Sequence, residues 1–177
     1  LMSSLSSENI LSRREASWAL GYMAGIGSRV SGATLLNSLK DKDIVLRRNT
    51  AWTLGKIKDI YSVDALLDTI SDNDTEVRRN SVWALGEIGD KKGTPELVKH
   101  LSDEARVVRA ESARALGKFR DVAALEPLLK ALVRVEKEHF TIRRESAWAL
   151  GELKDSKAVP PLIRAVTEKT VPAEMGM

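Results

Sequence analysis

Arg78-Arg79-Asn80-Ser81-Val82-Trp83-Ala84-Leu85-Gly86 is the stretch that decides the fold, because close variants of it occur five times in the chain. The other copies occupy residues 13–21, 47–55, 109–117 and 143–151, and their closing glycines lie 34, 31, 31 and 34 residues apart. Self-similarity at this period is the signature of a solenoid, in which each unit buries its apolar surface only by stacking on its neighbours.

Each repeat has the apolar pattern of two helices. In the third copy Val77, Ser81, Ala84, Leu85 and Ile88 fall on one side of a helix with 3.6 residues per turn. A shorter apolar group, such as Leu97 with Leu101, predicts a first helix in each repeat, with Asp43 and Asp74 placed to cap second helices. We therefore expect a single repeat array over residues 1–169 and a flexible tail over 170–177. The predicted second helices, called signature helices below, lie near residues 10–24, 44–58, 75–89, 106–120 and 140–154.

The composition is that of a folded protein without a membrane segment. The 177 residues are 43% hydrophobic and 30% charged, and no apolar run is long enough to cross a bilayer. Zero cysteines exclude disulfides and thiolate chemistry, and the N-terminal stretch lacks the pattern of a secretory signal, so we expect a cytoplasmic protein. The net charge of +3 is too small to indicate nucleic acid binding.

The run Val77-Arg78 … Ala84-Leu85-Gly86-Glu87-Ile88-Gly89-Asp90 resembles the short HEAT-like repeat of the phycobilisome-lyase type. The resemblance covers nearly the whole chain. It implies an all-α, right-handed α-solenoid (an armadillo/HEAT-like superhelix) of about five two-helix repeats. It further implies that the signature helices line a concave face and that residues opposite their buried stripe bind a partner.

At those outward positions four of the five repeats carry an arginine followed four residues later by a tryptophan. Arginine and tryptophan are the residue types most enriched in binding hot spots. The sequence leaves open whether each indole contacts a partner or only seals the stack against the adjacent repeat. In the fourth repeat Arg114 replaces tryptophan and Ala110 replaces arginine, so we expect that repeat to contribute least. The predicted partner-binding residues are Arg14, Trp18, Arg48, Trp52, Arg79, Trp83, Arg114, Arg144 and Trp148.

A second arginine column, one residue earlier, has aspartates six residues before several of its members. An anion-binding stripe is one interpretation, but charges beside a stacked interface are normally paired, so we expect a structural ladder between repeats. The arginines are Arg13, Arg47, Arg78, Arg109 and Arg143, and the aspartates are Asp41, Asp72 and Asp103.

We predict a non-enzymatic scaffold, without a cofactor or metal, that binds a protein or peptide in the groove. Iron-binding HEAT-repeat hydroxylases use His-Glu pairs, whereas this chain has Arg14-Glu15 and Arg144-Glu145 at the matching places, and His100 and His139 are expected to be isolated surface residues. Seven basic residues against five acidic ones in the groove disfavour nucleic acid. The alternative is a bilin lyase or chaperone-like subunit, since Trp and Arg could hold a tetrapyrrole.

The final apolar group, Leu162, Ile163 and Val166, has no repeat beyond it, so we expect either a longer array or pairing with another copy.

Overall fold

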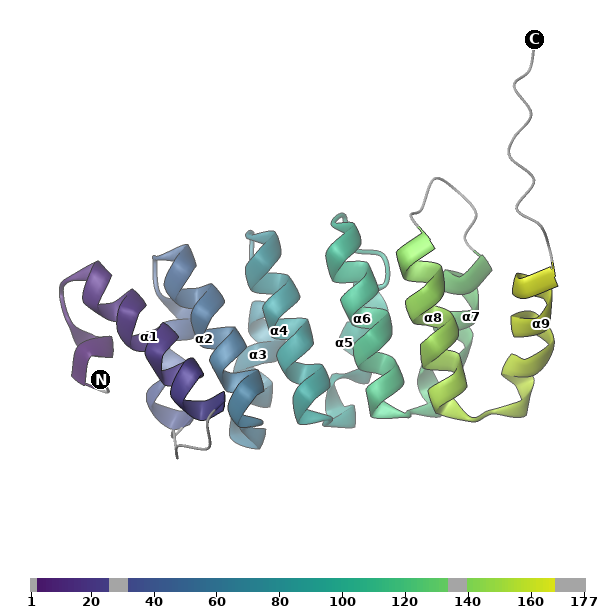
Figure 1. The fold of residues 1–177 in the computed structure, drawn as a ribbon, viewed down its shortest axis with the longest axis horizontal. Helices are drawn as coiled ribbons and strands as arrows, with labels where there is room; N and C mark the ends of the chain where they lie inside the picture. The colour runs from purple at the N-terminus through teal and green to yellow at the C-terminus, as the bar shows by residue number, and fades with distance from the viewer. Residues whose placement is uncertain (1–2, 26–31, 134–139, 168–177) are drawn as a thin grey trace, which may run out of the picture.

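The protein is described here by a computed structural model that covers residues 3–25, 32–133 and 140–167. Its helices form a regular stack from one end of the chain to the other (Figure 1). The predicted flexible tail, residues 170–177, lies outside the described residues. In the part of the chain that is described, no helix is long and apolar enough to span a membrane.

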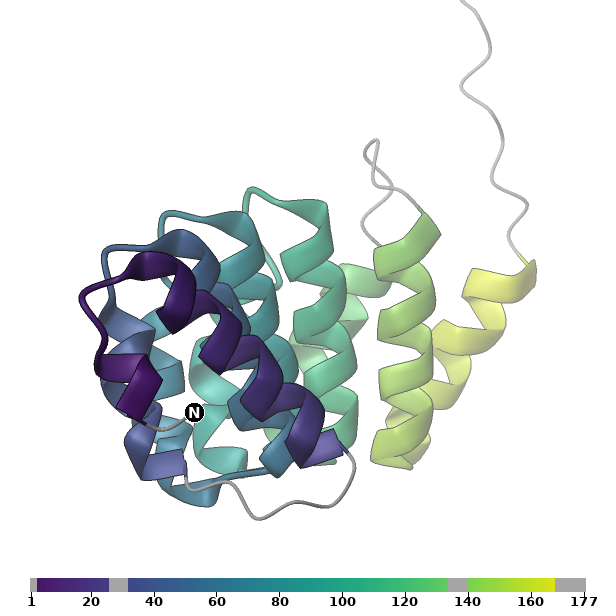
Figure 2. The same ribbon diagram turned by 60° about the vertical axis from the view of Figure 1, so that its left-hand side comes forward.

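The signature helices pack side by side in one layer, each on the next, and the first helices lie behind them (Figures 1 and 2). Their bounds are α1 (Ile10–Gly25), α2 (Ile44–Ile57), α4 (Thr75–Ile88), α6 (Arg106–Phe119) and α8 (Phe140–Leu153). The second layer contains α3 (Val63–Thr69), α5 (Thr94–His100), α7 (Leu125–Val133) and α9 (Val159–Thr167). This arrangement confirms the predicted α-solenoid.

The first two repeats depart from the pattern, because their first helices are 3-10 helices, at Ser3–Ser6 and Leu36–Lys40. Asn37 and Ser38 lie within the second of these, and both residue types have low α-helix propensity because their side chains compete for backbone hydrogen bonds. Leu35 and Leu39 are nevertheless fully buried. The apolar pattern therefore predicted the burial of this segment correctly, but not its helix type.

The core runs between the layers and is continuous from repeat to repeat. Leu54, Leu85 and Leu116, the residues before three of the repeated glycines, are each buried. Burial of such side chains is the main stabilising contribution in a stack of this kind. At the far end α9 buries no residue, and Ile163 and Val166 are exposed. That a further repeat or a second copy covers this face stays a prediction.

The second arginine column, which contains Arg47 and Arg78, links the repeats through their turns. Arg47 donates to both carboxylate oxygens of Asp72 at 2.7 and 3.0 Å, and it also donates to the backbone carbonyl of Asp41 in its own repeat at 2.8 Å. Arg78 repeats this geometry one unit later, with Asp103 at 3.0 and 3.1 Å. These bidentate pairs are partly buried and geometrically specific. Arg13, Arg47 and Arg78 therefore form the structural ladder between repeats that the sequence predicts.

Signature helices end in two ways. Gly89 closes α4 in the left-handed conformation at φ 81°, a region that glycine enters without steric cost. Lys58, Arg120 and Lys154 close α2, α6 and α8 at φ 51°, 49° and 54°, although they carry a Cβ atom. Three repeats therefore end in a conformation that costs a side-chain-bearing residue roughly 1–2 kcal/mol.

Candidate functional site

The outward face of α1, α2, α4, α6 and α8, called the signature face below, carries the predicted partner-binding residues. The tryptophans of α2, α4 and α8 each reach the glycine of the preceding repeat. A Cβ atom added to Gly55 would lie 2.6 Å from Cζ3 of Trp83, and one added to Gly117 would lie 2.7 Å from Cζ3 of Trp148. The glycines therefore recur because the next indole and the next helix backbone occupy the space that a side chain would fill.

These tryptophans are packed and partly accessible at the same time. Trp52 and Trp83 in the middle of the stack are half-buried, whereas Trp148 is 41% exposed. Trp18 has no described repeat before it and is 59% exposed, stacked on Tyr22 with ring centroids 5.8 Å apart. Lys56 lies over the indole of Trp52, 5.4 Å from its centroid, within cation–π range. In α2, α4 and α8 one edge of the indole therefore seals the stack while part of the ring stays accessible, and contact of these rings with a partner stays a prediction.

Two of the predicted partner-binding arginines, Arg14 and Arg48, are already paired. Arg14 donates through Nε to Asp43 at 2.9 Å and through Nη2 to the other oxygen of that carboxylate. Arg48 pairs with Asp74 in the same way, at 2.7 Å through Nε. Asp43 and Asp74 also cap α2 and α4 by accepting the Leu46 and Val77 backbone N–H groups. The hydrogen bonds from these arginines are the main reason that the pKa of each aspartate falls to about 2.

This pattern breaks between the third and fourth repeats. The residue before α6 is Ala105, which has no carboxylate, and Arg79 pairs instead with Glu76 of its own helix at 2.8 Å. Further along, Arg114 donates to Glu145 at 3.1 Å, and Arg144 donates to the same carboxylate at 2.7 Å.

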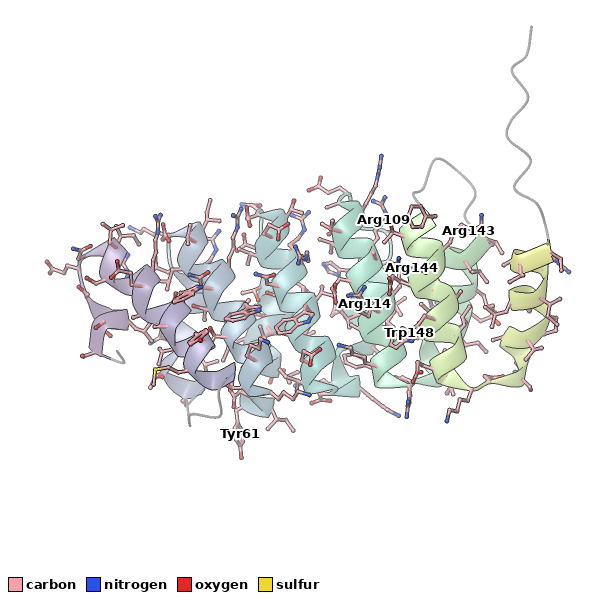
Figure 3. The ribbon with its side chains drawn as sticks, in the orientation of Figure 1. Tyr61, Arg109, Arg114, Arg143, Arg144 and Trp148 are labelled. Atoms are coloured by element: carbon pink, nitrogen blue, oxygen red, sulfur yellow. The ribbon has the colours of Figure 1, made fainter. Side chains whose placement is uncertain are left out.

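Burial alone would raise the pKa of Glu145, but the hydrogen bonds from these two arginines outweigh it, so the pKa lies below its ordinary value. On the C-terminal half of the signature face the arginine pairs thus follow a different plan. Arg114 on α6 and Arg144 on α8 lie on this part of the face (Figure 3).

The break leaves a hollow of about 350 Å³ between α4, α6 and α8, which we call the fourth-repeat hollow. Ala110 stands here where other repeats carry an arginine, so no long side chain fills the space. The pKa of Glu111 at this site is raised, chiefly because burial disfavours its charged form. The hollow is lined by Arg79, Arg106, Val107, Ala110, Glu111, Arg114, Thr141 and Ile142.

A second hollow of about 350 Å³ lies beside it, where Arg114 takes the place of a tryptophan. Its lining consists of Arg114, Lys118, Arg144, Glu145 and Trp148. Both hollows thus occur at the repeat that departs most from the consensus of this chain. The sequence contained the signal, because the residue before the signature helix is an aspartate at positions 43 and 74 but an alanine at position 105. Only the packing shows that a hollow results.

The described residues contain no cluster of three or more His, Cys, Asp or Glu side chains that could hold a metal ion. His100 is not the plain surface residue expected from the sequence. Its ring is half-buried, with Nε2 2.8 Å from the Ile70 carbonyl oxygen of the preceding repeat and Nδ1 2.9 Å from the Glu96 carbonyl oxygen, and in the neutral ring one of the two nitrogens donates. This histidine joins two repeats, and His139 lies outside the described residues.

Comparisons with known proteins agree with this geometry. No curated protein matches the chain. Among solved structures, a chain of the complex of CpcE and CpcF of phycocyanin lyase from Nostoc sp. PCC7120 matches with 28% identity and a TM-score of 0.70 over 82% of this chain. This match spans only 61% of that protein's length.

Two further solved structures support the fold. A designed armadillo repeat protein in complex with the peptide (KR)4 matches over 93% of this chain and 86% of its own, with 19% identity and a TM-score of 0.66. An engineered protein matches over 93% of this chain and 83% of its own, with 21% identity and a TM-score of 0.70. A sequence model described as HEAT repeats matches residues 1–74, 63–134 and 108–173. The chain therefore belongs to the HEAT-repeat family.

Proposed function

We propose that this protein is a non-enzymatic scaffold that binds a protein or peptide along the signature face. The observation that carries the proposal is the row of indoles: Trp52, Trp83 and Trp148 each pack on the glycine of the preceding repeat and keep part of the ring accessible. A rigid, amphipathic ring that loses little conformational freedom on binding is the usual anchor of a protein interface.

The charge on this face supports a protein partner over a polyanion. Arg14, Arg48 and Arg79 are each engaged with a carboxylate of this chain, so they do not form a stripe of unpaired cations. A nucleic acid groove requires many uncompensated positive charges that follow the phosphate backbone. A mixed surface with aromatic anchors is typical of protein recognition. The predicted array over residues 1–169 would provide one continuous face for such a partner.

The test is affinity purification with the immobilised protein from an extract of the source organism, followed by calorimetry with each partner that mass spectrometry identifies. Trp52→Ala and Trp83→Ala should weaken binding at least ~30-fold, since central hot-spot residues contribute about 2 kcal/mol or more. Trp18→Ala is the matched variant, because this indole has no described repeat before it to seal and its loss should lower affinity without lowering the melting temperature.

The outcome that contradicts the proposal is also defined by the packing. Because Trp83 fills the space above Gly55, its removal should lower stability whether or not a partner binds there. If all three alanine variants bind the partner with wild-type affinity once folded, the indoles only seal the stack. The partner-binding surface would then lie elsewhere.

A second candidate is a subunit of a bilin lyase, favoured by the 28% identity to a chain of the CpcE and CpcF complex. The half-buried indoles beside paired arginines could hold the rings and propionates of a linear tetrapyrrole. Titration with bilin, followed by visible absorbance, tests this candidate. A bound, red-shifted chromophore that Trp52→Ala abolishes would favour it over the scaffold, and an unchanged spectrum would exclude it.

A further inference from the structure

The fourth-repeat hollow lacks the carboxylate that precedes the signature helix at the equivalent positions of the two repeats before it. The residues before α2, α4 and α6 have nearly the same backbone conformation, with φ and ψ of −83° and 119° at Asp43, −87° and 125° at Asp74, and −86° and 123° at Ala105. Only the side chain differs. In the first two cases a carboxylate neutralises the arginine of the preceding helix, and in the third no carboxylate is present.

Three guanidinium groups and three apolar side chains line the hollow, and one of the guanidinium groups has no carboxylate partner among the described residues. The guanidinium groups are those of Arg79, Arg106 and Arg114. Arg79 pairs with Glu76 at 2.8 Å, and Arg114 pairs with Glu145 at 3.1 Å and lies 3.5 Å from Glu111. The guanidinium group of Arg106 forms no hydrogen bond or ion pair with any other residue that the structure describes. The apolar residues of the lining are Val107, Ala110 and Ile142.

The existing partner of Arg79 does not prevent it from binding another group. Its pair with Glu76 joins neighbours on one helix, and both side chains are more than 40% exposed. Such exposed pairs contribute little to stability, so their exchange for another carboxylate costs little. The bidentate pair of Arg48 with Asp74 shows the geometry that an arginine at this position adopts when a carboxylate is available.

We propose that the fourth-repeat hollow binds an acidic residue and a neighbouring aliphatic side chain of a partner protein, whose carboxylate takes the place of the aspartate absent at Ala105. The inference rests on the proposed function and names the chemistry that the signature face selects. A glutamate or aspartate would bridge Arg79 and Arg106, while an adjacent leucine-sized side chain covers Val107 and Ile142. A basic segment would meet three guanidinium groups and is disfavoured.

The experiment uses dye-labelled synthetic peptides, titrated with the protein and followed by fluorescence anisotropy. The probes are peptides built on Leu-Glu, Leu-Gln and Leu-Lys pairs with otherwise identical spacers. The Leu-Glu peptide should bind most tightly, and its affinity should fall as salt rises. Equal binding of the Leu-Gln peptide, or no binding of the Leu-Glu peptide, would overturn the inference.

Ala105→Asp is the decisive variant, because it restores the pairing of the earlier repeats without removing any residue of the hollow. The new carboxylate should pair with Arg79, repel the acidic peptide and lower its affinity about tenfold or more. An aspartate also caps α6, so the melting temperature should stay the same or rise. Ala123→Asp is the matched control, since it adds the same charge at an exposed turn and should leave binding unchanged.

The two proposals fail in different ways. If Ala105→Asp binds the Leu-Glu peptide as tightly as wild type while Trp83→Ala loses binding, the hollow is not the site but the signature face still is. If neither variant changes binding, the peptide binds elsewhere, and both proposals are contradicted for this ligand. Concentration-dependent sedimentation that Ala105→Asp abolishes would instead identify a second copy of this chain as the occupant.

Discussion

The repeated glycine offers a sharp test of the packing, because Gly→Ala should have opposite effects at two positions. At Gly55 an added Cβ would lie 2.6 Å from Cζ3 of Trp83 and 2.7 Å from the Cα atom of Ala84. Favourable carbon–carbon contacts lie at about 3.5–4.0 Å, so α2 and α4 must separate by about 1 Å. At Gly151, which has no described signature helix beyond it, the Cβ would meet nothing within 4 Å.

The magnitudes follow from these distances. Overpacking typically costs about 1–3 kcal/mol, and the upper end applies at Gly55 because a backbone atom of Ala84 cannot rotate away. Alanine recovers about 1 kcal/mol of helix propensity, so Gly55→Ala should lower the free energy of unfolding by about 2 kcal/mol. Gly151→Ala gains the higher helix propensity of alanine without a steric clash, so it should raise the free energy of unfolding by up to about 1 kcal/mol.

The assay is urea unfolding of both variants and wild type, followed by far-ultraviolet circular dichroism. Gly86→Ala serves as an intermediate case, because its nearest atom is the Ala115 Cβ at 2.9 Å and no indole covers it. Its midpoint should lie between those of the other two variants. If Gly55→Ala is as stable as wild type, or if both variants shift in the same direction, the close contact between repeats is not the reason for the glycine.

Two further predictions concern the helix ends. The pKa of Asp43 and of Asp74 is lowered to about 2, so their stabilisation is complete above the unfolded-state pKa of about 3.9 and is lost as the pH falls toward 2. The urea midpoint of Asp74→Asn should therefore fall less than that of wild type between about pH 5 and pH 2, and parallel curves would contradict the assigned pairing. Lys154→Gly relieves a left-handed residue at φ 54° and should raise the free energy of unfolding by about 1 kcal/mol. A lower urea midpoint for this variant would show that the conformation at the end of α8 is not strained.

Much of this molecule follows from local pattern. The recurrence of Trp-Ala-Leu-Gly with apolar residues at helical spacing is sufficient for an α-solenoid, because a helix with one apolar stripe must stack on a copy of itself. The caps at Asp43 and Asp74 are equally local, since a side chain and the backbone three residues later are covalently close. The pair of Arg47 and Asp72 was predictable because the aspartate recurs six residues before the arginine of the next repeat, so stacking brings it beside the arginine of the repeat before.

Tertiary structure decided which residues of adjacent repeats contact one another. The sequence marked the glycine as a close approach without identifying the neighbour, and only stacking shows that it is the indole of the next repeat at Gly21, Gly55 and Gly117 and an alanine at Gly86. The sequence also singled out the fourth repeat as the weakest part of the binding face, whereas packing turns its irregular residues, Ala105 and Ala110, into a hollow between three helices. An alanine in a helical pattern does not by itself show whether an empty space results. The space depends on whether residues distant in the sequence pack into it, and the helical pattern contains no information about those residues.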